Sequence, residues 1–240
     1  MRGNQPVTDL LDSPNGKRIS QLLFGEAFAV EKTEGAHSFG QMACGYQGWV
    51  PSAALAEPRE ASHFVNAMAT YIYAKPDMKS DVRLRLPFMA KVSVQKTEGT
   101  FAKLAEGFIF AAHLSHAPAS DYVATAERFL GVPYLWGGRA SLGIDCSGLA
   151  QMALHSAGIA APRDSGPQAN TAGVSIPSDA TLRRGDLVFW KGHVGLMQDP
   201  KRLLHATAYS MSVLTESLVT TVARVKAQGY GDIITIRRII

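Results

Sequence analysis

The sequence predicts a multidomain protein in which two small all-β units precede an α+β domain. Three observations lead to this prediction. Residues 7–115 contain short apolar runs separated by Gly, Pro, Asp and Asn, which is typical of small all-β units. This half also repeats itself, and the second half changes from helical to strand-like patterns. The predicted domains are residues 1–60, 61–116 and 117–240.

The repeat joins two similar segments of the first half. LLDSPNGKRISQLLFGEAFAVEKTEG is followed by YIYAKPDMKSDVRLRLPFMAKVSVQKTEG. Each copy has a proline before two apolar runs (Pro14, Pro76), ends in Lys-Thr-Glu-Gly, and precedes a Gly-aromatic-aliphatic triplet at 48–50 or 107–109. A spacing of about 60 residues indicates duplication of one unit the size of a small β-barrel. Chance similarity between two short-stranded segments is the alternative.

The second half begins with a linker at residues 115–121. A helix is predicted over Tyr122–Leu130, with Asp121 or Ser120 as its N-cap. A second helix begins at Cys146 and ends at Gly158. The later elements, in chain order, are strands at 186–190, 193–198 and 203–207, a helix at 216–228 and a strand at 233–240. Helices followed by an antiparallel sheet make this half an α+β domain.

The composition is that of a folded globular protein, with 46% hydrophobic and 18% charged residues among 240. The formal net charge of +4 is small for this length, and without a dense Lys/Arg run we expect no nucleic-acid partner. No stretch approaches the roughly 18 apolar residues of a membrane span. The first residues contain no apolar signal-peptide core, so we expect a cytoplasmic location, or a periplasmic or cell-wall location if a leader has been removed.

The candidate nucleophile is Cys146. The only other cysteine is Cys44, so a disulfide framework is excluded, and a single bridge between the two is the alternative to free thiols. Unpaired N–H groups at a helix start favour a thiolate, so we expect a lowered pKa and an oxyanion hole of backbone N–H groups. His193 and His205 fall on neighbouring predicted strands. We expect His193 to act as the base and His205 to accept its Nδ1 proton.

Six motifs resemble the NlpC/P60 peptidases in their order and spacing. They are YLWGG at 134–138, DCSG at 145–148, PRDSGPQ at 162–168, GDLVF at 185–189, GHVG at 192–195, and His205. The resemblance covers about residues 120–240. The first half resembles bacterial SH3-like (SH3b) domains, mainly through the two Gly-aromatic-aliphatic triplets. The fold implied is two SH3b-like barrels followed by a papain-like catalytic domain.

The resemblance implies hydrolysis of the γ-D-glutamyl–diamino acid bond in peptidoglycan stem peptides, the diamino acid being meso-diaminopimelate or lysine. Relatives with two SH3b domains resemble recycling enzymes for free muropeptides that begin with L-Ala–γ-D-Glu. The implied roles are Cys146 as nucleophile, His193 as base, His205 as orienting residue and Tyr134 as a hydroxyl near the oxyanion. No metal or organic cofactor is implied.

The resemblance also implies a set of substrate-binding residues. It comprises Asp145, Ser147, Arg163, Ser165 and Gln168, to which we add Trp136 and Tyr46. Tyr46 resembles a tyrosine that holds the ligand amine. An acid is expected beside it, but Cys44 and Gly45 occupy that place.

Two other functions remain open at this stage. One is a non-catalytic peptidoglycan-binding protein that works through its SH3b units. The other is an amidase or acyltransferase on the same scaffold. A zinc site formed by Cys146, His193 and His205 lacks the usual C-x-x-C or H-E-x-x-H spacing. The sequence specifies neither the diamino acid nor the oligomeric state.

Overall fold

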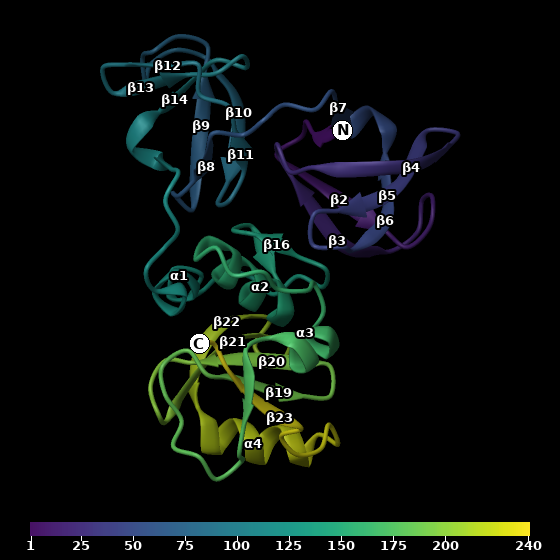
Figure 1. Cartoon of the computed structure of the whole chain (residues 1–240), viewed down its shortest axis with the longest axis vertical. Coiled ribbons are helices and arrows are strands. Elements are labelled where there is room, and N and C mark those ends of the chain that lie inside the picture. Colours follow the sequence, from purple (N-terminus) through teal and green to yellow (C-terminus); the bar gives the residue numbers. More distant parts are fainter. The chain divides into compact units, whose positions relative to one another are not determined.

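A computed structural model describes all 240 residues and divides into two compact units (Figure 1). Unit 1 contains Met1–Pro118 together with Ala140–Leu142, and unit 2 contains Ala119–Arg139 and Gly143–Ile240. None of the helices combines the length and the apolar character needed to span a membrane.

The first half of unit 1 is an antiparallel sheet with the strand order β3-β2-β6-β5-β4. In β2 and β5 every second residue is buried, which is the period of a strand with one face on a core. A short β1–β7 pair lies outside this sheet. The elements are β1 (Arg2–Gly3), β2 (Val7–Leu11), β3 (Arg18–Leu23), β4 (Phe28–Glu34), β5 (His37–Met42), β6 (Gln47–Pro51), the 3₁₀ helix η1 (Ser52–Ala54) and β7 (Leu55–Ala56).

The second half of unit 1 contains two antiparallel sheets, with strand orders β10-β9-β14-β13-β12 and β11-β8-β15. Its elements are β8 (His63–Val65), β9 (Ala69–Tyr73), β10 (Val82–Pro87), β11 (Lys91–Val92), β12 (Lys96–Glu98), β13 (Phe101–Lys103), β14 (Phe108–Phe110), the 3₁₀ helix η2 (Ala111–His113) and β15 (Leu114–Ser115).

The sequence repeat corresponds to a repeat of local structure. Both Lys-Thr-Glu-Gly copies end a strand of a hairpin at a glycine with positive φ, Gly35 at 56° and Gly99 at 58°. Both Gly-aromatic-aliphatic triplets end in a strand that runs into a 3₁₀ helix and then a two-residue strand. The two halves of unit 1 therefore close in the same way.

The predicted closed barrels are not observed, because both five-stranded sheets are open. In the first half, the edge strands β3 and β4 do not pair with each other. In the second half, the chain turns after Pro87 through Met89, whose φ is 65°, and this turn separates β10 from β11 in the other sheet. The turn residues between the strands interrupt the ladder that a closed barrel requires.

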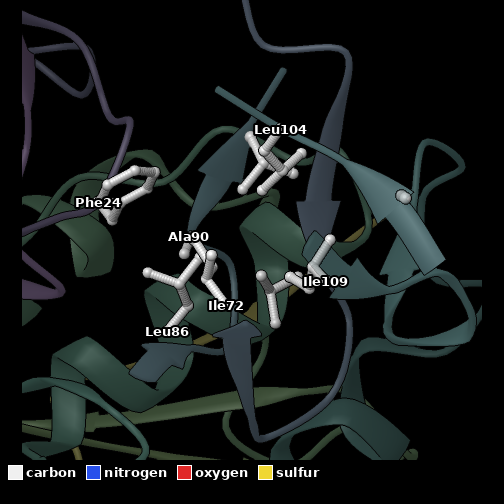
Figure 2. Close-up of a cluster of buried hydrophobic side chains, with 9 residues drawn as sticks. Phe24, Ile72, Leu86, Ala90, Leu104 and Ile109 are labelled. Atoms are coloured by element: carbon white, nitrogen blue, oxygen red, sulfur yellow. The ribbon is translucent and has the colours of Figure 1, made fainter. Parts of the chain in front are cut away.

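A phenylalanine from the first half completes the core of the second half (Figure 2). Phe24 is 3% exposed and belongs to a buried cluster whose other members all come from residues 65–109. Its carbonyl oxygen accepts a hydrogen bond from the Lys91 backbone N–H at 2.8 Å. Beside it, the Arg2 guanidinium lies 5.4 Å from the ring centroid and pairs with Glu106 at 3.2 Å. These contacts join the two halves of unit 1.

We expect Phe24→Ala to lower the free energy of unfolding by about 3–5 kcal/mol, because it empties a ring-sized space in a packed core. Urea unfolding of the full chain, followed through unit 1 amide signals, measures this loss. The control is Phe110→Ala, since Phe110 is 37% exposed in the same unit. Equal losses for the two variants would show that Phe24 is not part of this core.

Unit 2 is built around a six-stranded sheet with the order β18-β23-β19-β20-β21-β22. In Figure 1, α2 lies above these strands and α4 below them. The elements are α1 (Tyr122–Glu127), β16 (Arg139–Ala140), β17 (Gly143–Ile144), α2 (Cys146–Ser156), α3 (Ser165–Thr171), β18 (Val174–Ile176), β19 (Leu187–Trp190), β20 (His193–Met197), β21 (Arg202–Thr207), β22 (Ser212–Ser217), α4 (Leu218–Ala227) and β23 (Thr235–Arg238).

Most predicted elements of unit 2 are present, with two notable differences. Asp121 caps α1 as predicted, accepting from the Val123 and Ala124 N–H groups. The helix ends at Glu127 rather than at residue 130, because residues 128–130 continue with tighter i→i+3 hydrogen bonds. The predicted helix at 216–228 begins two residues later, since Glu216 belongs to β22, a strand that the periodicity did not indicate.

Candidate active site

Cys146 is the first residue of α2, where a backbone N–H has no partner within the helix. Asp145 is the N-cap, and its carboxylate accepts from the Gly148 N–H at 2.7 Å. A side chain at position 148 would bring Cβ within 2.3 Å of the Gly138 carbonyl oxygen, so this position requires glycine. The glycine therefore permits close packing of the loop behind Cys146.

A buried ion pair holds this helix start in place. Arg163 is 2% exposed and donates two hydrogen bonds to Asp145, at 3.0 Å to Oδ1 and 2.6 Å to Oδ2. The same guanidinium donates to Ser147 Oγ at 2.9 Å. Asp145 also accepts from the Gly137 N–H at 2.8 Å. One carboxylate thus ties the helix that carries the thiol to the loop before it.

A tight hairpin places His193 near the thiol. β19 and β20 pair with Trp190 opposite His193, so only Lys191 and Gly192 form the turn. Gly192 has a φ of 74°, a conformation that favours glycine. Its carbonyl oxygen lies 3.9 Å from the Cys146 sulfur. The turn therefore brings the start of β20 against the start of α2.

His205 lies on β21, the antiparallel neighbour of β20. His193 Nε2 and His205 Nδ1 are 2.8 Å apart. The predicted pairing of the two histidines is present, but through Nε2 of His193 and not through Nδ1. The reason is reach, because Nε2 is the ring nitrogen farther from its own backbone and so spans the gap between strands. Nδ1 of His193 takes no part in this contact, and both His193 and Cys146 line one cavity.

These side chains open into one cavity of about 440 Å³ within unit 2. It is lined by Cys146, His193 and His205, by Tyr134 and Trp136 from the first motif, and by side chains of β21, α4 and the residues after each. Trp136 is 69% exposed, so an indole stands at the rim. Both cysteines are free, and no group of three or more His, Cys, Asp and Glu side chains in the structure is arranged to hold a metal ion.

Comparison with known proteins identifies the family. Residues 131–228 match the model of the NlpC/P60 family, and residues 10–55 match that of the bacterial dipeptidyl-peptidase SH3 domain. A γ-D-glutamyl-L-lysine dipeptidyl-peptidase of Bacillus subtilis is 30% identical over 227 residues, covering 82% of this chain and 75% of that protein. The chain belongs to the NlpC/P60 family.

Two further relatives agree with this assignment. A protein from Bacillus cereus with the same dipeptidyl-peptidase name is 29% identical and covers 70% of this chain, which spans 59% of its length. A crystal structure of an NlpC/P60 family protein from Bacillus cereus has a TM-score of 0.83 at 21% identity, covering 99% of this chain and 98% of that one. At this level of identity, the similarity to the crystal structure shows a shared fold. An SH3 domain thus precedes the NlpC/P60 domain of a cysteine peptidase.

The thiol of the ligand-free NlpC/P60 domain is protonated. Burial, with a contribution from the Asp145 carboxylate, raises the pKa of Cys146 to about 12. Backbone hydrogen bonds from Val194 and Ser147 act in the opposite direction and are outweighed. The predicted lowering of the pKa by the helix start is therefore wrong, because desolvation of a sulfur that is 7% exposed exceeds the effect of the helix terminus.

Both histidines are neutral at pH 7. Burial, with smaller effects of His205 and Arg224, lowers the pKa of His193 to about 3. Burial and Arg224 lower the pKa of His205 to about 4. A neutral imidazole keeps one ring nitrogen with a lone pair that can accept a proton. Burial also raises the pKa of Tyr134, which leaves its hydroxyl able to donate.

Five of the predicted substrate-binding residues are not among those that line the cavity: Asp145, Ser147, Arg163, Ser165 and Gln168. All five are buried. Gln168 donates to the carbonyl oxygens of Ser147 and Pro162, at 3.0 and 2.8 Å. The structure gives these side chains a supporting position behind the nucleophile. Tyr46 lies in unit 1, where it packs on the core of the first half.

One residue that the sequence analysis missed contacts the histidine pair. His205 Nε2 lies 3.0 Å from Glu216 Oε2. The signal that would have revealed it is an acidic residue on the strand next to the His205 strand, but this part of the chain was predicted to be helical.

We expect Cys146 in the ligand-free protein to react with iodoacetamide more slowly at pH 7 than free cysteine does, because its raised pKa leaves little thiolate. The rate should continue to rise above pH 9, toward the pKa of about 12. Mass spectrometry of the Cys44→Ala variant, whose only thiol is Cys146, measures this profile, and the same variant unfolded in urea is the control. A midpoint below that of free cysteine would contradict the neutral resting site.

We expect Arg163→Met to lower the free energy of unfolding by about 3–5 kcal/mol, because it leaves the Asp145 carboxylate buried without its partner charge. Urea unfolding measures the loss, and Arg163→Met combined with Asp145→Asn should recover part of it. If Arg163→Met retains full stability and only raises KM, then Arg163 contacts the substrate, as the family resemblance implied.

Proposed function

We propose that this protein hydrolyses the amide bond between γ-D-glutamate and the diamino acid of peptidoglycan stem peptides. The observation that carries the proposal is the convergence of the Cys146 thiol and the His193–His205 pair on one cavity. The type of bond is supported by two relatives named γ-D-glutamyl-L-lysine dipeptidyl-peptidases. The leaving diamino acid would be lysine or meso-diaminopimelate.

In the first step, Nδ1 of neutral His193 takes the thiol proton as the sulfur attacks the γ-glutamyl carbonyl carbon. The charge that develops on the carbonyl oxygen would be stabilised by the Cys146 N–H and the Tyr134 hydroxyl, two donors at the same cavity. Because a free thiolate is not populated beforehand, proton transfer accompanies attack. His205 accepts from Nε2 of His193 throughout and steadies the imidazolium.

In the second step, the imidazolium of His193 gives its Nδ1 proton to the leaving nitrogen, and the C–N bond breaks. A thioester then links the γ-carbonyl of glutamate to Cys146. A water molecule then loses a proton to Nδ1 of His193 and attacks the carbonyl carbon of the thioester. The C–S bond breaks, the sulfur takes up the proton from Nδ1, and the γ-carboxylate and the thiol are released. The thiol proton ends on the leaving amine, and the water proton ends on the sulfur. The scheme therefore needs no further reactant.

The domain organisation proposed here is an SH3b-like unit at 1–60, a second at 61–116 and the NlpC/P60 domain at 117–240. The second SH3b-like unit is supported by its shared closing elements: a positive-φ glycine in the hairpin, then a strand, a 3₁₀ helix and a short strand. By the family resemblance, two such units imply an enzyme that acts on free muropeptides. We propose that Trp136, at the rim of the cavity in unit 2, binds this ligand. For Tyr46, ligand binding stays a prediction from the family resemblance.

We expect Cys146→Ala to reduce hydrolysis of L-Ala–γ-D-Glu–diaminopimelate by about 10⁴-fold or more, because nothing replaces the nucleophile. Product analysis by mass spectrometry shows which amide is cut, and circular dichroism verifies the fold. Cys44→Ala is the matched control and should keep its activity. Full activity in Cys146→Ala would exclude the proposed chemistry, and cleavage of another amide would indicate a different acyl-transfer enzyme.

The same assay tests the form of the substrate. Incubation of the native protein with free tripeptide and, separately, with intact murein sacculi compares the two forms. We expect release of the diamino acid from the tripeptide alone. Release from sacculi at a similar rate would show that the protein acts on the polymer.

A further inference from the structure

A carboxylate lies directly behind the histidine pair. Glu216 Oε2 is 3.0 Å from His205 Nε2, and His205 Nδ1 is 2.8 Å from His193 Nε2. The three side chains thus form a continuous row of hydrogen bonds that ends at the cavity. Glu216 itself is not among the residues that line this cavity. Any effect of the carboxylate on the substrate must therefore pass through its cavity-lining neighbours, His205 and Arg224.

Strand pairing explains why Glu216 reaches His205. Leu203 of β21 pairs with Glu216 of β22, and His205 pairs with Leu214. Residues two apart on one strand share a face, so His205 and Glu216 are diagonal neighbours on the same face of the sheet. The contact is therefore set by the register of β21 and the edge strand β22, and not by a loop.

Two polar side chains of α4 face the Glu216 carboxylate. The Arg224 guanidinium donates to Oε2, and the Thr221 hydroxyl lies 3.1 Å from the same oxygen. Both residues are on α4, spaced so that they share one side of the helix. Glu216 directly precedes Ser217, the N-cap of α4. An ionised carboxylate can accept hydrogen bonds but cannot donate them.

This one restriction determines where each proton of the row lies. Because Glu216 only accepts, His205 must carry its proton on Nε2. Neutral His205 then has a lone pair on Nδ1, so His193 must donate from Nε2. Neutral His193 is left with a lone pair on Nδ1, the nitrogen that faces no strand partner. If either ring had the opposite tautomer, Nδ1 of His193 would already carry a proton. It could not then accept the proton of the thiol.

We propose that Glu216 is a positioning residue that sets the tautomers of His205 and His193, so that Nδ1 of His193 can accept the Cys146 proton. This inference rests on the proposed function for its kinetic consequence, but not for the tautomers themselves. The row also suits the later imidazolium, because His205 still accepts from Nε2 of His193 after Nδ1 has been protonated.

The first test measures the tautomers in the native protein. Nitrogen-15 NMR of histidine-labelled full-length protein at pH 7 distinguishes protonated from unprotonated ring nitrogens. We expect His193 and His205 both to carry the proton on Nε2. A His205 protonated on Nδ1 would overturn the proposal, whether or not the protein cuts a stem peptide, and this measurement requires no variant to fold.

The second test removes the acceptor. We expect Glu216→Met to lower kcat on the L-Ala–γ-D-Glu–diaminopimelate tripeptide by about 10²-fold, the scale of general-base catalysis, with little change in KM. Its NMR spectrum should show a fraction of His205 protonated on Nδ1. Glu216→Gln, which can place an amide oxygen where Oε2 lies, should restore the wild-type tautomers and most of kcat.

Glu127→Met is the matched control, since Glu127 also accepts from an arginine, Arg184, and from Gln198, without lining the cavity. It should leave kcat and the histidine tautomers unchanged. Equal kcat values for Glu216→Met and Glu127→Met would overturn the proposal. If the wild type shows the expected tautomers but cuts no stem peptide, the proposed function fails while the assignment of the tautomers to Glu216 stands.

Discussion

The site depends on one buried carboxylate. Asp145 caps α2, holds the preceding loop through the Gly137 N–H, and pairs with Arg163 in two hydrogen bonds. Because its two oxygens are shared among these donors, the helix start can move only if several contacts break together. The position of the Cys146 sulfur follows from this arrangement. Its electrostatic consequence is that the same carboxylate opposes ionisation of the neighbouring thiol.

Burial raises the pKa of the Cys146 thiol and lowers the pKa of His193 and His205, so it favours the neutral form of all three groups. Charge then has to develop during the reaction, in the place where donors and the histidine row can stabilise it. This is the situation in which preorganised dipoles contribute most to catalysis. A preformed thiolate would instead be exposed to alkylation and oxidation without substrate.

In unit 1 the main constraint is the stability of two small β units. A segment of about 60 residues buries a limited share of its surface and is marginal alone. The insertion of Phe24 into the core of the second half lets both halves share one apolar cluster (Figure 2). The Arg2–Glu106 pair at the edge of this contact adds specificity more than energy, as is usual for partly exposed ion pairs. The duplication in the sequence is therefore accompanied by an asymmetric contact that the repeat does not predict.

Local sequence signals predicted much of this protein. The cap at Asp121, the helix that begins at Cys146 and the adjacent strands of His193 and His205 all follow from patterns spanning a few residues. Capping, turns and periodicity are properties of neighbouring residues, which is why the sequence alone shows them. The family motifs likewise pointed to Cys146, His193 and His205, which the structure brings to one cavity.

Tertiary structure decided the remaining features, since each sums contributions from residues far apart in the chain. The thiol pKa rises because the whole surrounding domain excludes water, an effect that the helix start cannot reveal. The use of Nε2 by His193 and the place of Glu216 depend on the register of three strands. Closure of a sheet depends in the same way on pairing between its first and last strands. Local patterns predict the helices and strands. The desolvation of side chains and the pairing of strands are determined only when those helices and strands pack together.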